Sequence, residues 1–361
     1  IDLCLKYQIE PIPTLYHFEM PQALVEEFGG WKSRKCIDAF EKYAQICFTR
    51  YKDKVRYWIT VNEQLIAMAA SDLNGNHEPD KKKQMKNMYQ MSYHVSIAEK
   101  KAFALLHSIA PQAKIGVVNA VQNVYPKTSS PQDVLAAMDG EEMLMYMLLD
   151  MSVYGKYSSR VIDILSKTDC LPVIDESDQL LLSNKPDFIG INYYSSICVQ
   201  ENKTNEINYK LPPFFRSQQF EVVDNQYLEK SEWMTNGIDP LGLRTIIYKI
   251  YNRYHLPIII TENGMAYSDL LENGEVHDNY RIDYLAKHIK EVLIAKKEGY
   301  PIFGYCPWSF IDVLSSHQGF KKRYGLVYVD RSDEDIKECK RYKKDSFYWY
   351  QKVINNNGEN L

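Results

Sequence analysis

Short runs of β-branched and aromatic residues alternate along the chain with longer segments whose apolar residues recur every three or four positions. The short runs are typical of buried strands, and the longer segments are typical of amphipathic helices. This alternation predicts βαβ units around a parallel sheet, and therefore an α/β fold. Strands are expected within residues 11–15, 55–61, 114–118, 188–193, 257–261 and 302–305.

The segments between these strands are expected to be mainly helical. Ser33 can cap a helix that continues to about residue 47, and further helices are predicted over 95–109, from 282 to a stop at Gly299, and around 347–354. The methionine-rich segment from Met138 to Met147 is interpreted as a buried helix, because methionine fills irregular cores far more often than it binds a soft metal. Residues 72–86 are expected to form an excursion, and 200–232 a long loop over a site.

Composition and charge narrow the class of protein. The 361 residues have a formal net charge of −4 and are 45% hydrophobic, values that argue against a dedicated nucleic-acid binder and against a disordered chain. No apolar run approaches the roughly 20 residues that cross a bilayer, so no membrane partner is expected. The seven scattered cysteines favour a reducing compartment, the cytoplasm, and no structural zinc.

Two glutamates follow predicted strands at the ends where α/β barrels carry their chemistry. Glu63 follows the strand that ends near Val61, Glu262 follows the strand 257–261, and each has an asparagine neighbour. Two carboxyls from different strands suit the hydrolysis of a glycosidic bond. Position alone is a weak signal, because the chain holds 47 acidic residues.

Four motifs make the hypothesis specific. Residues 14–21, 58–63, 187–194 and 260–264, in this order and spacing, resemble successive signatures of glycoside hydrolase family 1. The resemblance extends over essentially the whole chain. It implies a single (β/α)8 TIM-barrel catalytic domain over 1–361, with Glu63 as general acid/base and Glu262 as nucleophile of a retaining mechanism. It also implies sugar-binding roles for His17, Asn62 and Trp308, and hydrogen bonds from Asn192 and Tyr194 to the nucleophile or the sugar.

A later segment resembles one branch of that family, the 6-phospho-β-glucosidases. Ser315 stands where β-glucosidases of unphosphorylated sugars carry a glutamate, and Lys322 and Tyr324 complete the serine, lysine and tyrosine set that holds a 6-phosphate. A hydroxyl, an ammonium and a phenol offer donors and one positive charge to a dianion. The implied reaction is retaining hydrolysis of 6-phospho-β-D-glucosides to glucose 6-phosphate, without a metal or organic cofactor. The small Ser316 favours a gluco over a galacto substrate.

The chain departs from the family at its start. It begins at Ile1, just before what resembles the third barrel strand, so the first two strands are expected to be missing and the chain to be unstable unless they are supplied. Two alternatives stay open: a β-glucosidase for unphosphorylated sugars, and an inactive sugar-phosphate-binding remnant that has lost the barrel. The aglycone preference and a homo-oligomer also stay open.

Overall fold

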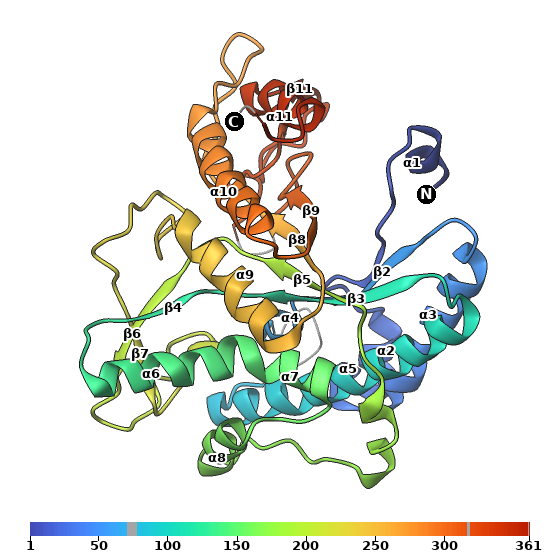
Figure 1. Ribbon diagram of the computed structural model, residues 1–361, viewed down its shortest axis with the longest axis vertical. Coiled ribbons are helices and arrows are strands. Elements are labelled where there is room, and N and C mark those ends of the chain that lie inside the picture. Colours follow the sequence, from blue (N-terminus) through green and yellow to red (C-terminus); the bar gives the residue numbers. More distant parts are fainter. Residues whose placement is uncertain (71–77, 316–317, 360) are drawn as a thin grey trace. The chain divides into compact units, whose positions relative to one another are not determined.

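The computed structural model describes residues 1–70, 78–315, 318–359 and 361, with the elements labelled in Figure 1. The chain forms two compact units. The first consists of residues 1–121, 126–190 and 199–222, and the second of residues 122–125, 191–198 and 223–361. The prediction of one catalytic domain over 1–361 stays a prediction. Each unit is described below by itself.

The first unit contains the parallel strands β1 (Thr14–Tyr16), β2 (Tyr57–Asn62) and β3 (Lys114–Ala120). Thr14 pairs with Ile59 across β1 and β2, and Ile59 pairs with Gly116 across β2 and β3. Gly116 has no room for a side chain, because a Cβ there would lie 2.3 Å from the Phe188 ring. Strand β5 (Phe188–Asn192) begins in this unit and ends in the second.

Helices alternate with these strands along the chain, as the periodicity predicts. The long pair α3 (Lys35–Tyr51) and α5 (Lys81–Ile109) packs together. Asp80 begins α5 by accepting hydrogen bonds from the backbone amides of Lys82 and Lys83 at 2.9 and 3.2 Å, as an N-cap does. The expected excursion over 72–86 was therefore wrong for residues 81–86, which are helical, and its residues 72–77 lie outside the described part of the chain. The shorter helices are α1 (Asp2–Lys6), α2 (Gln22–Phe28), α4 (Gln64–Ala69) and α8 (Ser159–Lys167).

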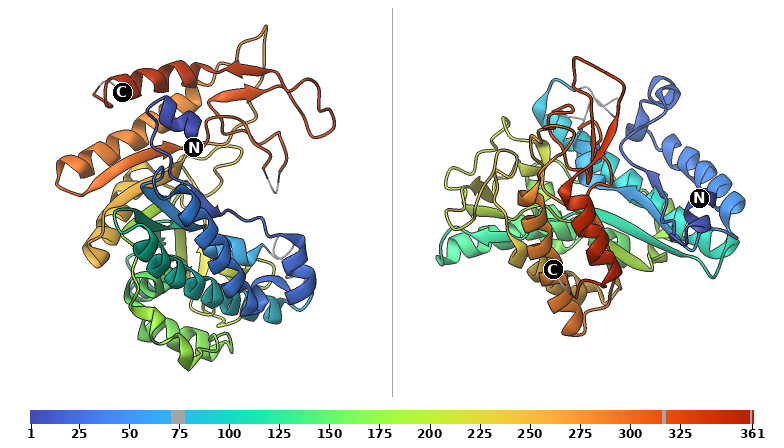
Figure 2. Two further views of the ribbon diagram at one scale, coloured as in Figure 1. Left: turned by 90° about the vertical axis from the view of Figure 1, so that its right-hand side faces the viewer. Right: turned by 90° about the horizontal axis from the view of Figure 1, so that it is seen from above.

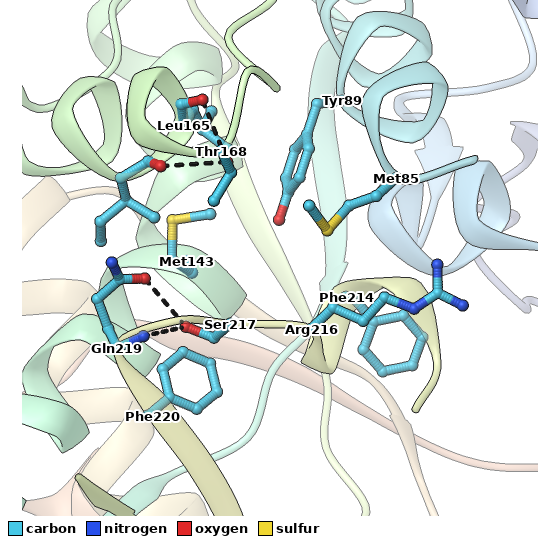
Figure 3. Close-up of a pocket in the computed structure, with 11 residues that line it drawn as sticks. Met85, Tyr89, Met143, Leu165, Thr168, Phe214, Arg216, Ser217, Gln219 and Phe220 are labelled. Atoms are coloured by element: carbon cyan, nitrogen blue, oxygen red, sulfur yellow. Dashed lines mark hydrogen bonds between the residues drawn. The ribbon is translucent and has the colours of Figure 1, made fainter. Parts of the chain in front are cut away.

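The methionine-rich segment is helical, as predicted. It comprises α6 (Pro131–Glu141), a π-helical turn (Glu142–Tyr146) and α7 (Met147–Tyr154). Met143 points into a small cavity beside Met85 and Tyr89 (Figure 3). The prediction of burial was wrong for Met138, which is 59% exposed, because it lies on the outer face of α6.

The segment 200–232 was predicted to be a loop, and this was wrong in part. It continues strand β6 (Ile197–Glu201) and contains a short 3₁₀ turn (Pro213–Phe215) and strand β7 (Phe220–Val223). The amide of Asn202 donates to the Gln219 carbonyl at 3.3 Å, which joins the two limbs of the segment. Strand β4 (Val124–Pro126) lies earlier in the chain.

The second unit is built on the parallel pair β8 (Ile258–Asn263) and β9 (Ile302–Pro307). Helix α10 (Asn279–Lys297) packs against α9 (Pro240–Tyr254) and α11 (Asp345–Asn355), as Figures 1 and 2 show. Leu285, Ile289 and Val353 belong to the core between α10 and α11. A short antiparallel pair follows, β10 (Val327–Val329) and β11 (Arg341–Lys343). All six predicted strands are thus confirmed.

Candidate active site

The predicted site residues fall into two groups, one in each unit. The first unit carries Glu63, with His17 and Asn62. The second unit carries Glu262 and the other predicted sugar- and phosphate-binding residues, which are Asn192, Tyr194, Trp308, Ser315, Lys322 and Tyr324.

Glu63 lies immediately beyond β2 and precedes the first turn of α4. Its backbone is in the left-handed region, with a φ of +46°, which is uncommon for a residue with a side chain. The Glu63 amide donates to the Val118 carbonyl of β3 at 3.0 Å, and the Glu63 carbonyl accepts from the Ala67 amide at 2.9 Å. These bonds hold the sharp turn between β2 and α4. The Glu63 side chain is half-buried.

His17 and Asn62 are the candidates beside this carboxylate in the first unit. The Asn62 amide nitrogen lies 3.3 Å from His17 Nε2, and these two residues come from β2 and from the end of β1. Burial lowers the pKa of His17, while Glu19 opposes that effect. A neutral imidazole can both donate and accept a hydrogen bond, which suits a sugar hydroxyl.

Glu262 lies within β8 and is only 8% exposed. The Tyr194 hydroxyl donates to Glu262 Oε2 at 2.6 Å, and the Tyr193 amide donates to the Glu262 backbone carbonyl at 2.9 Å. A short hydrogen bond to a carboxylate fixes its direction. This contact places the Tyr194 side chain against Glu262, and the binding role expected of Tyr194 stays a prediction.

The next residue, Asn263, ties β8 to its surroundings through a fully buried side chain. Its amide donates to the Tyr193 carbonyl at 2.6 Å, and its oxygen accepts from the Tyr305 hydroxyl at 2.6 Å. The backbone amide of Trp308 donates to the Asn263 carbonyl at 2.9 Å. Gly264 then passes so close that a Cβ there would lie 2.2 Å from the Trp308 carbonyl oxygen. The end of β8 and the Trp308 segment are therefore held in one arrangement.

Asn192 lies at the end of β5 and is buried. The hydroxyl of Thr261, on β8, donates to Asn192 Oδ1 at 2.6 Å. This bond orients the amide group with its oxygen toward β8. Thr261 was not among the predicted site residues, although it directly precedes Glu262 in the sequence.

The three candidate phosphate-binding residues lie on the segments that follow Trp308. The Tyr324 ring packs edge-on against the Tyr194 ring, with centroids 5.8 Å apart, so the phosphate candidates reach the neighbourhood of Glu262 through that pair. The Lys322 ammonium lies 5.6 Å from the Tyr324 ring centroid and 5.6 Å from that of Trp233. Among the described residues, the hydrogen bonds of Ser315 go to Gly319, at 3.2 and 3.0 Å, rather than to the other two candidates.

Lys322 is half-buried between these two rings. Burial lowers the pKa of its ammonium, and no carboxylate in the described part of the chain forms an ion pair with it. The neighbouring Lys321 is exposed and pairs instead with Glu232 at 3.3 Å. A positive charge that is partly removed from water and has no counter-ion among the described residues is suited to binding an anion.

Within the described residues, no group of three histidine, cysteine or acidic side chains could hold a metal ion. The cavity of Figure 3 is lined by none of the predicted site residues. None of the helices described has both the length and the apolar character that a bilayer crossing requires. Ser316, on which the gluco preference rests, lies outside the described residues.

Comparison with known proteins finds similarity along nearly the whole chain. The profile of Glycosyl hydrolase family 1 matches residues 1–359. The aryl-phospho-beta-D-glucosidase BglC of Bacillus subtilis (strain 168) is 40% identical over 377 residues, which cover all of this chain and 78% of BglC. The 6-phospho-beta-glucosidase AscB of Escherichia coli (strain K12) is 38% identical, covering 99% of this chain and 74% of AscB. The family 1 b-glucosidase from Thermotoga maritima superimposes with a TM-score of 0.87 at 31% identity, covering all of this chain and 76% of that structure.

Proposed function

Because the chain belongs to Glycosyl hydrolase family 1, whose fold is the (β/α)8 TIM barrel, we propose that it hydrolyses 6-phospho-β-D-glucosides to glucose 6-phosphate and an aglycone or sugar. The observation that carries the proposal is the Lys322 ammonium, which is half-buried between Trp233 and Tyr324. Two relatives at 40% and 38% identity bear names that specify phosphorylated substrates. The free thiols of all seven cysteines suit the reducing cytoplasm, where we propose that the enzyme acts.

The proposed chemistry is a double displacement. A carboxylate oxygen of Glu262 attacks the anomeric carbon, the glycosidic C–O bond breaks, and Glu63 gives its proton to the leaving oxygen. Water then attacks the same carbon, Glu63 takes a proton from it, and the bond to Glu262 breaks. Two inversions give net retention. The contacts of Tyr194 with Glu262 support this division, because a nucleophile must be held in one direction.

The proposed sugar-binding roles rest on side chains that their neighbours already orient. His17 with Asn62, and Asn192 with Thr261, present hydrogen-bonding groups that would bind the hydroxyls of the glycone. Trp308 would provide the apolar floor under the sugar ring. A sugar has polar edges and apolar faces, so both kinds of contact are required.

The proposed phosphate site consists of Ser315, Lys322 and Tyr324. A 6-phosphate carries two negative charges near neutral pH, so it would form charge-assisted hydrogen bonds with the ammonium and accept further ones from the two hydroxyls. A glutamate at position 315 would repel the phosphate. This is the difference that separates the proposal from its alternative, a β-glucosidase for unphosphorylated sugars, which the structural similarity to the Thermotoga maritima enzyme favours.

The test compares kcat/KM for a chromogenic aryl β-glucoside with and without a 6-phosphate. Lys322→Ala should lower the value about ten- to hundredfold for the phosphorylated substrate only, the equivalent of roughly 1.5 to 3 kcal/mol. Ser315→Glu should shift the preference further toward the unphosphorylated substrate.

Lys321→Ala is the matched control, because Lys321 is adjacent but exposed and paired with Glu232. It should leave the ratio unchanged. A ratio that is the same in wild type, Lys322→Ala and Ser315→Glu would contradict the phosphate assignment. Cleavage of neither substrate by the wild-type chain would favour an inactive sugar-phosphate-binding remnant.

A further inference from the structure

A group of charged side chains is buried in the second unit beneath the segments that carry the phosphate candidates. Their side chains are at most 7% exposed, and they form one continuous set of ion pairs: Asp269, Asp278, Arg281, Asp312, Arg323 and Lys344. Three carboxylates and three cations balance in charge. Buried charges of this kind are tolerated only when every member is paired, so the group has little freedom to rearrange.

Asp312 lies at the centre of this group. It belongs to the segment that carries Ser315, and it contacts the segment that carries Lys322 and Tyr324. Its Oδ2 accepts from Arg323 Nη1 at 2.9 Å, and its Oδ1 accepts from Lys344 Nζ at 2.7 Å and from the Gly325 amide at 2.9 Å. Ser315 follows Asp312 by three residues along the chain. One carboxylate therefore joins the segment of Ser315 to the segment that runs through Gly325.

Arg323 also holds the segment that carries Lys322 and Tyr324 through hydrogen bonds that do not involve Asp312. Its guanidinium also donates to the carbonyls of Val329 and Arg331, at 2.9 and 2.6 Å. Its backbone pairs with that of Tyr267 in both directions, at 3.1 and 2.9 Å. Side chain and main chain of this residue are thus held together by at least five hydrogen bonds, including that to Asp312.

The sequence neighbours of Arg323 are the two phosphate candidates Lys322 and Tyr324. In an extended segment, successive side chains point to opposite faces. Arg323 is buried and Lys322 and Tyr324 are half-exposed, and the Lys322 ammonium lies 5.6 Å from the Tyr324 ring centroid, which places these two side chains on the same side. When the Arg323 side chain is fixed on the inner face, Lys322 and Tyr324 are fixed on the other.

We propose that Asp312 and Arg323 are positioning residues for the substrate's 6-phosphate, because their ion pair holds Lys322 and Tyr324 at the separation that the phosphate requires. The inference rests on the proposed function. It adds that phosphate selectivity depends on a buried ion pair that never touches the substrate. A small displacement of a binding group can cost about a hundredfold in rate, so loosening this pair should be visible in kinetics.

The experiment measures kcat and KM for the phosphorylated and unphosphorylated aryl β-glucosides in Asp312→Asn. We expect KM for the phosphorylated substrate to rise about ten- to hundredfold, with a much smaller change in kcat, because the contacts of Glu262 are untouched. The ratio of the two kcat/KM values should fall accordingly. Arg323→Lys keeps the charge but loses the fork to Val329 and Arg331, so it should show a smaller fall in the same ratio.

Asp278→Asn is the matched control. Asp278 belongs to the same buried group, but its contacts are with Arg281 and with the amide and hydroxyl of Ser346. We expect it to lower the melting temperature without changing the ratio of the two kcat/KM values. A purely structural role of the group would make Asp312→Asn and Asp278→Asn alike in both measurements.

The outcomes separate the two proposals. If Lys322→Ala lowers the ratio while folded Asp312→Asn and Arg323→Lys do not, the positioning role is wrong and the phosphate site stands. If Lys322→Ala also leaves the ratio unchanged, both are wrong. Should Asp312→Asn fail to fold, Arg323→Lys decides: a ratio equal to wild type contradicts the positioning role.

Discussion

The ends of β2 and β8 each present an asparagine next to a glutamate, but they hold the carboxylate differently. Glu63 lies beyond its strand, on a left-handed turn, and its side chain is half-buried. Glu262 lies inside its strand, is buried, and receives a short hydrogen bond from Tyr194. The difference fits the two proposed roles. A nucleophile acts from one direction, whereas an acid/base must change its protonation state twice in each cycle.

The largest expected effect comes from removing the nucleophile. Glu262→Gln keeps the shape of the side chain, so binding should survive, but no glycosyl-enzyme can form. We expect turnover to fall to below about 0.1% of wild type. Steady-state kinetics and the Kd for glucose 6-phosphate measure the two effects. Turnover near the wild-type level would mean that Glu262 is not the nucleophile.

The second change tests the other strand end. Glu63→Ala removes a proton donor, which should cost about 10²- to 10⁴-fold in kcat for substrates with poor leaving groups. Activated aryl substrates need no proton in the first step, so their glycosylation should be slowed far less. The exposed Glu27→Ala serves as a control and should change neither. Equal losses with both kinds of substrate would exclude Glu63 as the acid.

A smaller effect is expected when the hydrogen bond that distinguishes the β8 end is removed. Tyr194→Phe loses the donor to Glu262 Oε2, and a hydrogen bond to a charged group contributes roughly 1.5 to 3 kcal/mol. We expect kcat/KM to fall about ten- to hundredfold for phosphorylated and unphosphorylated substrates alike. Tyr227→Phe, on an exposed ring, should leave both values at the wild-type level. A loss confined to the phosphorylated substrate would assign Tyr194 to the phosphate site instead.

The smallest effect concerns pH. Burial lowers the pKa of Lys322, so its ammonium loses its proton at a lower pH than an exposed lysine does. The charge, and with it the preference for phosphorylated substrate, is present below that pKa and is lost as the pH rises through it. The ratio of kcat/KM values should therefore decline on the alkaline side in wild type. In Lys322→Arg, whose guanidinium stays charged, the ratio should be flat; a parallel decline would assign the titration to another group.

Much of the fold could be predicted because its strands are short, β-branched and flanked by helical periodicity. The six strands and the strand-end positions of Glu63 and Glu262 follow from that pattern. The segment 200–232 was harder, since β7 contributes only four residues with no clear alternation. Met138 was misplaced because a run of methionines says nothing about which face of a helix each one occupies.

Contacts in the site could be predicted from the sequence when the two residues are close in the chain, and could not when they are far apart. Tyr194 and Glu262 could be paired only through the family resemblance, because 68 residues separate them. No pattern brings Trp233 to Lys322, since nearly ninety positions lie between them. The order Lys322, Arg323, Tyr324 was a usable signal, because successive side chains in an extended segment point to opposite faces. An arginine between two outward-facing residues is then expected to point inward and to need a buried partner.

The close passage of Gly264 beside the Trp308 carbonyl has a consequence for directed evolution. In a library randomised around Glu262, any side chain at position 264 would push the Trp308 segment away, so active clones should return glycine there almost without exception. Neighbouring positions that contact only side chains can accept compensating changes nearby, whereas a backbone oxygen cannot be mutated. Position 264 would thus act as an internal standard, reporting how stringently a screen selects for the intact sugar site.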